Sequence, residues 1–189
     1  EGAAALDDLA DILDHCNGPS IVKPAKGYNS RGLSYVEGNS KEALGRAIRK
    51  ANLHGDLIII EDLIPGRLVN VDGLMIDGRM HPIGIIERDC YGDDGFQPLT
   101  GILPARMPSE DQDALFEVAL RAALSLGFRD GPFTVDVILN NEGPVLLELT
   151  PNFHSILITL ASENGWALRA WLAYLAADPS WETHLEPPS

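Results

Sequence analysis

Alternation of apolar and polar residues is clearest in residues 133–139 and again in residues 145–150. Successive side chains of a strand point to opposite faces, so each run predicts a strand with one more polar face. These faces hold Thr134, Asp136 and Ile138 on the first strand, and Leu146, Glu148 and Thr150 on the second. Between the runs, Asn141-Glu142-Gly143 suits a three-residue hairpin loop in which Gly143 takes the left-handed conformation. We therefore predict an antiparallel hairpin.

The predicted loop sets the register of this hairpin. A three-residue loop pairs Asn140 with Pro144, and counting outward it places Asp136 directly opposite Glu148. Directly opposed side chains have Cβ atoms about 4.5–5.5 Å apart, where two negative charges repel. The repulsion is relieved if one carboxyl stays protonated or if a divalent cation binds between the two. A two-residue loop would instead place Asp136 opposite Leu147, and a simply solvated hairpin face is the alternative interpretation.

The rest of the chain mixes short strands with helices. Strands are expected at residues 20–24, 33–36, 56–61, 67–75 and 80–88, and helices at residues 3–15, 40–53, 109–126, 156–160 and 166–176. Ser40 and Ser109 are expected to cap the helices that they precede or begin. Residues 88–108 are rich in Gly, Asp and Pro and predict a long loop. This order of elements, with an antiparallel sheet crossed by a helix, predicts an α+β fold.

Composition and charge narrow the classes of function. The chain has 189 residues, of which 45% are hydrophobic, and a formal net charge of -14, so it can bury a core but has no basic run to neutralise phosphates. We expect no nucleic-acid partner. No apolar run approaches the roughly 20 residues that span a bilayer, so we expect no membrane partner either. Two cysteines without metal-ligand spacing favour free thiols and a cytoplasmic location. The chain begins at Glu1 rather than Met, and we therefore expect it to be a piece of a longer protein.

A lysine and a glycine-containing loop form the second candidate site. Lys23 ends a short strand, and the loop that follows contains Gly27 and Gly32. Glycines allow tight turns whose consecutive N–H groups can surround an anion, and Lys23 can reach the same anion as a point charge. The loop matches neither a Walker A motif nor GxGxxG, and an ordinary turn is the alternative.

A buried strand with an acidic end forms the third candidate site. Residues 57–60 are apolar, and Glu61 and Asp62 follow before Pro65-Gly66. The backbone just past such a strand can hydrogen-bond the edge of a planar base, and the Pro-Gly pair suits a linker between lobes. A strand that ends in a solvated Glu is the alternative.

Taken together and in order, these segments resemble the ATP-grasp superfamily. The matching motifs are KPAKGYNSRG at 23–32, IEDLIPG at 60–66 followed by VDG at 71–73, and GPFTVD at 131–136 ending in LELTPN at 147–152. The similarity is greatest to carboxylate–amine ligases that join amino acids, including the dipeptide-forming ligases of bacteria. It implies two lobes that clamp a nucleotide, a small β-rich lobe with a helix at residues 1–62 and a larger lobe with the metal-binding hairpin at residues 63–189.

The resemblance also implies roles for individual residues. Lys23 would bind the α- and β-phosphates of ATP, and Ser30, Arg31 and Gly32 would lie in the loop that closes over the phosphates. Lys23 and Arg31 would be the catalytic residues.

Further expected contacts concern the base, the ribose and the metal. Glu61 would accept from the adenine amino group, and the backbone of Asp62 and Ile64 would read the purine edge. Asp136 and Glu148 would hold Mg²⁺ between the phosphates.

Three positions depart from the family pattern. The family places Asn where this chain has Thr150 and Arg where it has Asn152, and that Arg supports charge on the transferring group. The usual ribose carboxylate is replaced by Leu68, although Asn70 and Asp72 follow along the same strand and could substitute.

The resemblance implies an ATP-dependent, ADP-forming ligase that activates a carboxylate as an acyl phosphate and couples it to an amine. The alternative is a catalytically impaired nucleotide-binding module with a regulatory or assembly role, favoured by Thr150 and Asn152. The expected cofactors are ATP and Mg²⁺. The expected partners are small-molecule carboxylate and amine substrates and an N-terminal domain of the parent chain, with a homodimer left open.

Overall fold

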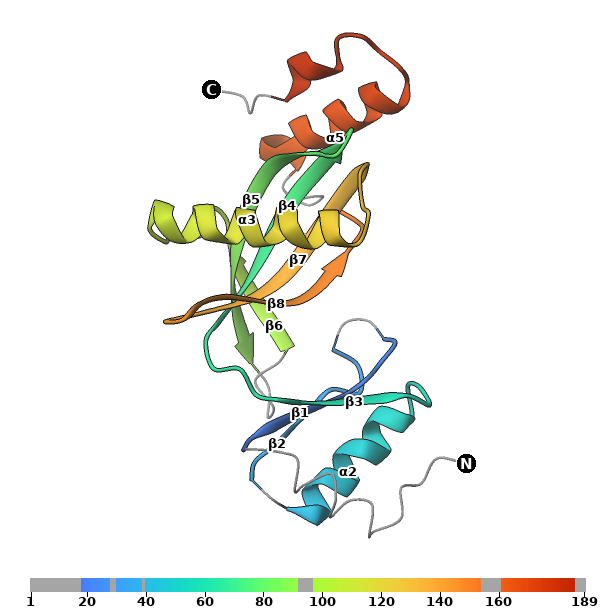
Figure 1. Cartoon of the computed structure of the whole chain (residues 1–189), viewed down its shortest axis with the longest axis vertical. Helices are drawn as coiled ribbons and strands as arrows, with labels where there is room; N and C mark the ends of the chain where they lie inside the picture. The colour runs from blue at the N-terminus through green and yellow to red at the C-terminus, as the bar shows by residue number, and fades with distance from the viewer. Residues whose placement is uncertain (1–17, 28–29, 39, 92–96, 154–160, 186–189) are drawn as a thin grey trace. The chain divides into compact units, whose positions relative to one another are not determined.

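The structure is a computed structural model that describes residues 18–27, 30–38, 40–91, 97–153 and 161–185. The helices expected at 3–15 and 156–160 lie outside these ranges. The chain divides into two compact units. Unit 1 comprises Glu1–Ile64 with Cys90–Leu99, and unit 2 comprises Pro65–Asp89 with Thr100–Ser189. Both units combine antiparallel strands with helices (Figure 1), which confirms the predicted α+β class.

Unit 1 contains a three-stranded antiparallel sheet with the order β2-β1-β3. Its strands are β1 (Ser20–Pro24), β2 (Ser34–Val36) and β3 (Ile58–Asp62), and α2 (Lys41–Asn52) packs on one face of the sheet. The predicted Ser40 cap is confirmed, because its hydroxyl oxygen accepts from the backbone N–H of Ala43 at 3.2 Å. Apolar residues at helical spacing on α2 meet the side chains of Val22, Ile58 and Ile60. The opposite face of the sheet carries Lys23 of β1 and Glu61 of β3 together with their apolar partners Ile59 and Ile21.

Unit 2 contains most of a five-stranded sheet with the order β6-β5-β4-β7-β8. The strands are β4 (Arg67–Ile76), β5 (Arg79–Tyr91), β6 (Gln97–Ile102), β7 (Gly131–Asn140) and β8 (Gly143–Thr150). The long loop predicted for residues 88–108 is wrong at residues 88–91 and 97–102, because β5 continues to Tyr91 and β6 pairs beside it. A neighbouring strand supplies hydrogen-bonding partners, which outweighs the weak strand propensity of Gly, Asp and Pro.

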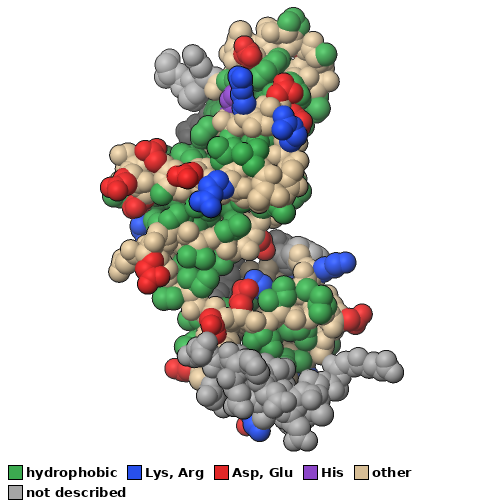
Figure 2. All heavy atoms as spheres, viewed as in Figure 1, with side chains coloured by type: hydrophobic (Ala, Val, Ile, Leu, Met, Phe, Trp, Pro, Cys, Tyr) green, Lys and Arg blue, Asp and Glu red, His purple; other side chains and the backbone are tan. Residues whose placement is uncertain are grey.

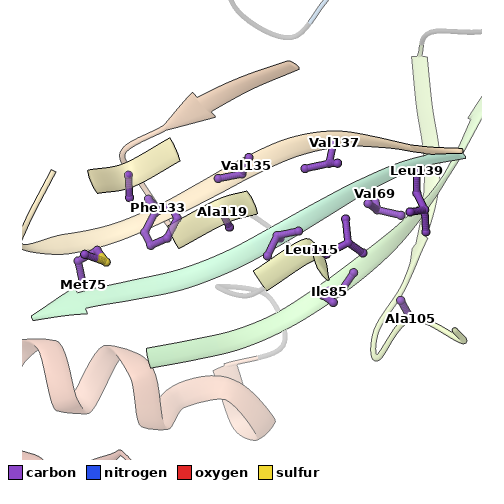
Figure 3. Packing of buried hydrophobic residues seen from close by; sticks show 12 residues of the cluster. Val69, Met75, Ile85, Ala105, Leu115, Ala119, Phe133, Val135, Val137 and Leu139 are labelled. Atoms are coloured by element: carbon purple, nitrogen blue, oxygen red, sulfur yellow. The ribbon is translucent and has the colours of Figure 1, made fainter. Parts of the chain in front are cut away.

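Helix α3 (Ser109–Ser125) covers one face of this sheet (Figure 3). Figure 3 shows Leu115 and Ala119 of α3 among Val69, Phe133 and Val135 of the strands. The prediction that Ser109 caps this helix is wrong: Pro108 is the N-cap residue and there is no side-chain capping hydrogen bond. The first turn of α3 instead carries Glu110 and Asp111, whose charges favour a helix N-terminus.

Helix α5 (Ala161–Leu175) and the short 3-10 helix η1 (Trp181–His184) pack at the far end of β4 and β5. Leu74 and Ile76 of β4 meet Ala170 and Trp171 of α5 in a small apolar cluster. The hydroxyl of Tyr174 lies 3.1 Å from the Oδ1 of Asp77 and 3.2 Å from that of Asp130, at the two strand connections. Within the described residues, no helix is both long enough and apolar enough to cross a membrane.

Candidate functional site

The face of the five-stranded sheet that points away from α3 carries a group of polar side chains. The strand register shows which residues share it, because directly paired residues lie on the same face. The group, called the polar face below, consists of Arg88 from β5, Asn70 and Asp72 from β4, Thr134 and Asp136 from β7, and Glu148 and Thr150 from β8. The apolar residues that alternate with these polar ones along the same strands pack against α3. The alternation of each strand therefore produces both the core and this polar face.

Asp136 and Glu148 are directly opposed, as predicted, although the route to that register differs from the prediction. The hairpin turn is Asn141-Glu142, a two-residue loop, since Asn140 pairs with Gly143 rather than Pro144. The predicted three-residue loop is therefore wrong. A β-bulge restores the register: Val137 pairs with Leu146, but Asp136 pairs with Glu148, so Leu147 is an extra residue.

The bulge also changes which apolar residues accompany Glu148. Val145 pairs with Ile138 and therefore lies on the polar side, whereas Leu146 pairs with Val137 on the side that faces α3. The prediction that Leu146 shares a face with Glu148 is wrong. Beyond the bulge, Leu149 packs against the α3 core. One extra residue thus directs an acidic side chain and an apolar side chain to their appropriate faces.

The surroundings of Asp136 disfavour its ionised form. Burial, and then the charge of Glu148, raise the pKa of Asp136 to about 6. The side-chain amide of Asn70 donates to its Oδ1 and favours the ionised form. Within the described residues, no group of three or more His, Cys, Asp or Glu could hold a metal. Two opposed carboxylates nevertheless fit Mg²⁺, which commonly takes one or two carboxylates and completes its shell with phosphate oxygens and water.

Asp72 is the most deeply buried carboxylate of the polar face, with 1% of its surface exposed. The hydroxyl of Thr134 donates to its Oδ1 at 2.5 Å, while Oδ2 is buried and has no hydrogen-bonding partner among the described residues. Burial is the main reason that the pKa of Asp72 rises to about 7, and the charge of Asp136 adds to it.

Arg88 is the member of the polar face that the sequence did not single out. Asn70 pairs with Ile86, so Arg88, two residues further along β5, lies on the side of Asn70. Its charge lowers the pKa of both Asp72 and Asp136 against the larger effect of burial. Arg88 is the last residue of the strand predicted at 80–88 and the first of the loop predicted at 88–108, and the alternation of that strand already places it on the side of Ile86.

In unit 1, Lys23 and Glu61 form an ion pair with 2.5 Å between Nζ and Oε1. Ile21 pairs with Glu61 and Lys23 pairs with Ile59, so both charged side chains lie on the face that α2 does not cover. The side chains of Lys23 and Glu61 are 26% and 39% exposed, which leaves both accessible to a ligand. The two residues were predicted to bind different parts of a nucleotide, and the structure brings them into contact.

The outer edge of β3 leaves backbone groups available beside this pair. Leu63 donates its N–H to Pro19 and Leu57 accepts from Ala25, so odd-numbered residues of β3 point toward β1. Alternation turns the backbone groups of Asp62 to the other edge, which no described strand covers. Ile64 lies just beyond the strand. This edge could hydrogen-bond a planar base.

The loop after Lys23 is described in part. Tyr28 and Asn29 lie outside the described residues. Ser30 and Gly32 both have positive φ, of 54° and 80°, and a Cβ at Gly32 would lie 2.8 Å from the ring of His54. Glycine is therefore required at position 32. Arg31 is exposed between them.

Comparison with known proteins agrees with the motifs. Residues 16–159 match the sequence model of a family described as the ATP-grasp domain. The D-alanine–D-alanine ligase of Mycobacterium ulcerans is 33% identical over 154 residues, which cover 73% of this chain and 40% of that ligase. Carnosine synthase 1 of Gallus gallus is 27% identical over 118 residues, which cover 62% of this chain and 12% of the synthase.

Among solved structures, the L-amino acid ligase from Bacillus licheniformis superposes with a TM-score of 0.67 at 19% identity. The match covers 99% of this chain and 48% of that ligase and indicates a shared fold. The chain spans less than half the length of each of these three proteins.

Proposed function

The chain belongs to the ATP-grasp family, and from this premise we propose that it is the nucleotide-binding region of an ATP-dependent ligase. The ligase would activate a small-molecule carboxylate as an acyl phosphate and couple it to an amine, with release of ADP. Both curated relatives are named as a ligase or a synthase, and the solved neighbour is an amino acid ligase.

The observation that carries this proposal is the direct opposition of Asp136 and Glu148 on paired strands of the polar face. Two ionised carboxylates at this spacing repel, and the charge of Glu148 adds to the larger effect of burial in raising the pKa of Asp136. A divalent cation removes this repulsion. Mg²⁺, when bound, would neutralise charge on the phosphates of ATP, and Asn70 would hold Asp136 in place through its amide.

Unit 1 would supply the contacts to the rest of the nucleotide. We assign Lys23 to the α- and β-phosphates and Glu61 to the adenine amino group, so the ion pair between them would open when ATP binds. The outward backbone of Asp62, followed by Ile64, would read the purine edge. Ser30, Arg31 and Gly32 would close over the phosphates, with Arg31 near the transferring group.

In the proposed reaction the protein forms no covalent bond to the reactants. An oxygen of the substrate carboxylate attacks the γ-phosphorus, the bond to the β–γ bridging oxygen breaks, and ADP leaves. The amine then attacks the acyl carbon and displaces phosphate. The chain's contribution would be alignment of the reactants and neutralisation of charge.

The wider assignments follow from the same proposal. We assign residues 1–62 and 63–189 to the smaller and larger lobes of the family fold. A further domain of the parent chain would complete the substrate pocket, Asn70 or Asp72 would contact the ribose, and the enzyme would act in the cytoplasm.

A second candidate function rests on Thr150 and Asn152. Thr150 lacks the side-chain amide and Asn152 lacks the guanidinium that the family pattern places at these two positions, and Asn152 is exposed. A module that binds nucleotide without turning it over would serve regulation or assembly. Mg-dependent binding without turnover in the full-length parent protein would favour this candidate.

The proposal is tested by removing one metal ligand at a time. We expect Asp136→Asn and Glu148→Gln to weaken binding of Mg-ADP by at least about tenfold, which corresponds to ~1.4 kcal/mol. Glu142→Gln in the exposed turn of the same hairpin is the matched control and should bind as the unmodified chain does. Isothermal titration calorimetry with and without Mg²⁺ measures the effect, and circular dichroism checks the fold. Unchanged affinity in both site variants would refute the metal assignment.

A further inference from the structure

Arg88 carries a hydrogen-bonding group that nothing in the described structure satisfies. Its Nη1 is buried and has no hydrogen-bonding partner among the described residues. A guanidinium is charged at all relevant pH values and has five N–H donors in a planar fork. Leaving one of them buried and unpaired costs free energy, more so for a charged group than for a neutral one. Such a donor needs a partner from outside the described residues, which an ordered water or a bound ligand can supply.

The neighbours of Arg88 favour a binding site. Its charge acts on Asp72 and on Asp136, yet each carboxylate already accepts a hydrogen bond at Oδ1, from Thr134 and Asn70 respectively. No ion pair joins Arg88 to either carboxylate among the described interactions. The guanidinium therefore lies in an acidic surrounding without being committed to any one acid. Arg88 as a whole is only partly buried.

Arg67 on the adjacent strand shows the ordinary alternative. Its Nη1 lies 3.1 Å from Oε1 of Glu87, and the two side chains form a surface ion pair. Val69 pairs with Glu87, so this pair lies on the side of the sheet that faces α3. Two arginines near the same end of the sheet thus differ in the face they occupy and in whether their N–H groups are satisfied.

We propose that Arg88 binds the terminal phosphoryl group of ATP and supplies the guanidinium that Asn152 cannot. The inference rests on the proposed function, since it places the terminal phosphoryl group next to a metal at Asp136. The phosphoryl group carries its charge on non-bridging oxygens, and a planar fork can donate two parallel N–H bonds to them. When the terminal phosphoryl group is transferred from ATP to the substrate carboxylate and ADP leaves, Arg88 keeps its protons and continues to hold the same oxygens.

The position of Arg88 separates its role from that of Lys23. Lys23 is in unit 1 and is assigned to the α- and β-phosphates, whereas Arg88 is on the polar face with the metal carboxylates. A residue that contacts only the terminal group distinguishes a triphosphate from a diphosphate. This difference is the measurable consequence of the proposal.

The experiment compares Mg-ADP with the Mg complex of a non-hydrolysable ATP analogue by isothermal titration calorimetry. We expect Arg88→Gln to weaken the analogue by about 10- to 100-fold, the range for a charge-assisted hydrogen-bond pair, and to change Mg-ADP by less than about twofold. Arg88→Lys keeps the positive charge but loses the planar fork of donors. Its affinity for the analogue should lie between that of the unmodified chain and that of Arg88→Gln. The matched control, Arg67→Gln, should leave both affinities unchanged.

The outcomes distinguish this inference from the proposed function. Equal losses for both nucleotides, or no loss for either, would overturn the assignment of Arg88 while leaving nucleotide binding intact. A contact to the substrate carboxylate instead of the phosphoryl group would appear as an unchanged affinity for the analogue and would also overturn it. Failure of the unmodified chain to bind either Mg-nucleotide would overturn the proposed function, and this inference with it. Arg88→Lys provides the decisive comparison if Arg88→Gln does not fold.

Discussion

Asp72 and Asp136 show how single residues on the polar face hold charge at a cost in stability. Both pKa values are raised, mainly by burial, to about 7 and about 6. Such groups are common at functional sites because ligand binding can recover the stored cost. Asp72 is not assigned to the metal, so its titration can be followed in the protein alone.

We predict that Asp72 makes the fold less stable as pH rises. Its unfolded pKa is 3.8 and its folded pKa is about 7, so between these values the unfolded chain releases a proton that the folded chain keeps. The stabilisation present below about pH 4 is therefore lost as pH rises to about 7, by a few kcal/mol at about 1.4 kcal/mol per pKa unit. Asp72→Asn keeps an oxygen for the Thr134 hydroxyl and should unfold at higher urea near pH 8 than the unmodified chain.

The measurement is urea unfolding of both proteins at about pH 5 and about pH 8. The stability of Asp72→Asn should still fall from about pH 5 to about pH 8, but by less than that of the unmodified chain, because Asp136 still titrates with a raised pKa. A parallel decline in both proteins would show that Asp72 ionises as easily in the folded chain as in the unfolded chain.

Among the elements, the β7–β8 hairpin shows how a local irregularity sets the site. The two-residue turn by itself would place Leu147 opposite Asp136 and direct Glu148 toward the α3 core. The bulge moves Glu148 to the polar face and Leu149 to the core. Burial of Leu149 and solvation of Glu148 both favour the bulged register, because a one-residue slip would reverse the two environments.

We predict that deletion of Leu147 preserves the metal site. Without the extra residue, regular pairing from the same turn places Glu148 opposite Asp136, so Mg-dependent binding of ADP should remain within about threefold of the unmodified chain. Deletion of Leu149 is the control, since it shifts Thr150 toward the core and removes an apolar contact. Calorimetry together with thermal melting makes the comparison. Loss of Mg dependence in the folded Leu147 deletion would show that the bulge itself shapes the site.

At the scale of the whole molecule, negative charge dominates. Twenty-eight Asp and Glu residues stand against 14 Lys and Arg. Figure 2 shows acidic side chains gathered over the N-terminal part of α3, where Glu110 and Asp111 lie. Surface ion pairs such as Arg46 with Glu42 and Arg67 with Glu87 contribute only about 0–1 kcal/mol each. With a formal net charge of -14, we expect mutual repulsion among the acidic side chains to outweigh these pairs.

We predict that added salt stabilises the fold. Raising the ionic strength from about 0.01 M to about 0.15 M shortens the Debye length from about 30 Å to about 8 Å and screens the repulsion. The melting temperature measured by calorimetry should rise. Choline chloride should act as NaCl does, which excludes cation binding at Asp136 and Glu148 as the cause. A lower melting temperature in salt would mean that local ion pairs dominate.

Several features of this protein were determined by the sequence itself. Alternation over residues 133–150 specified two strands and the side of Asp136, since side-chain direction in a strand depends only on position along it. Ser40 specified the start of α2, because a cap hydrogen bond is made within three residues. The ordered motifs identified the family, as the match over residues 16–159 agrees. These are local properties or properties of order along the chain.

Other features were decided only by the tertiary structure. Residues 97–102 became β6 because β5 lies beside them, which their composition did not indicate. The bulge at Leu147 depends on the α3 core that receives Leu149. Pairing between β1 and β3 brings Lys23 to Glu61. Pairing among the strands of the larger sheet places Arg88 on the same face as Asp72 and Asp136, where its charge acts on both. Which distant strands pair, and in which register, depends on burial and hydrogen bonding summed over the whole sheet, so no local pattern contains it.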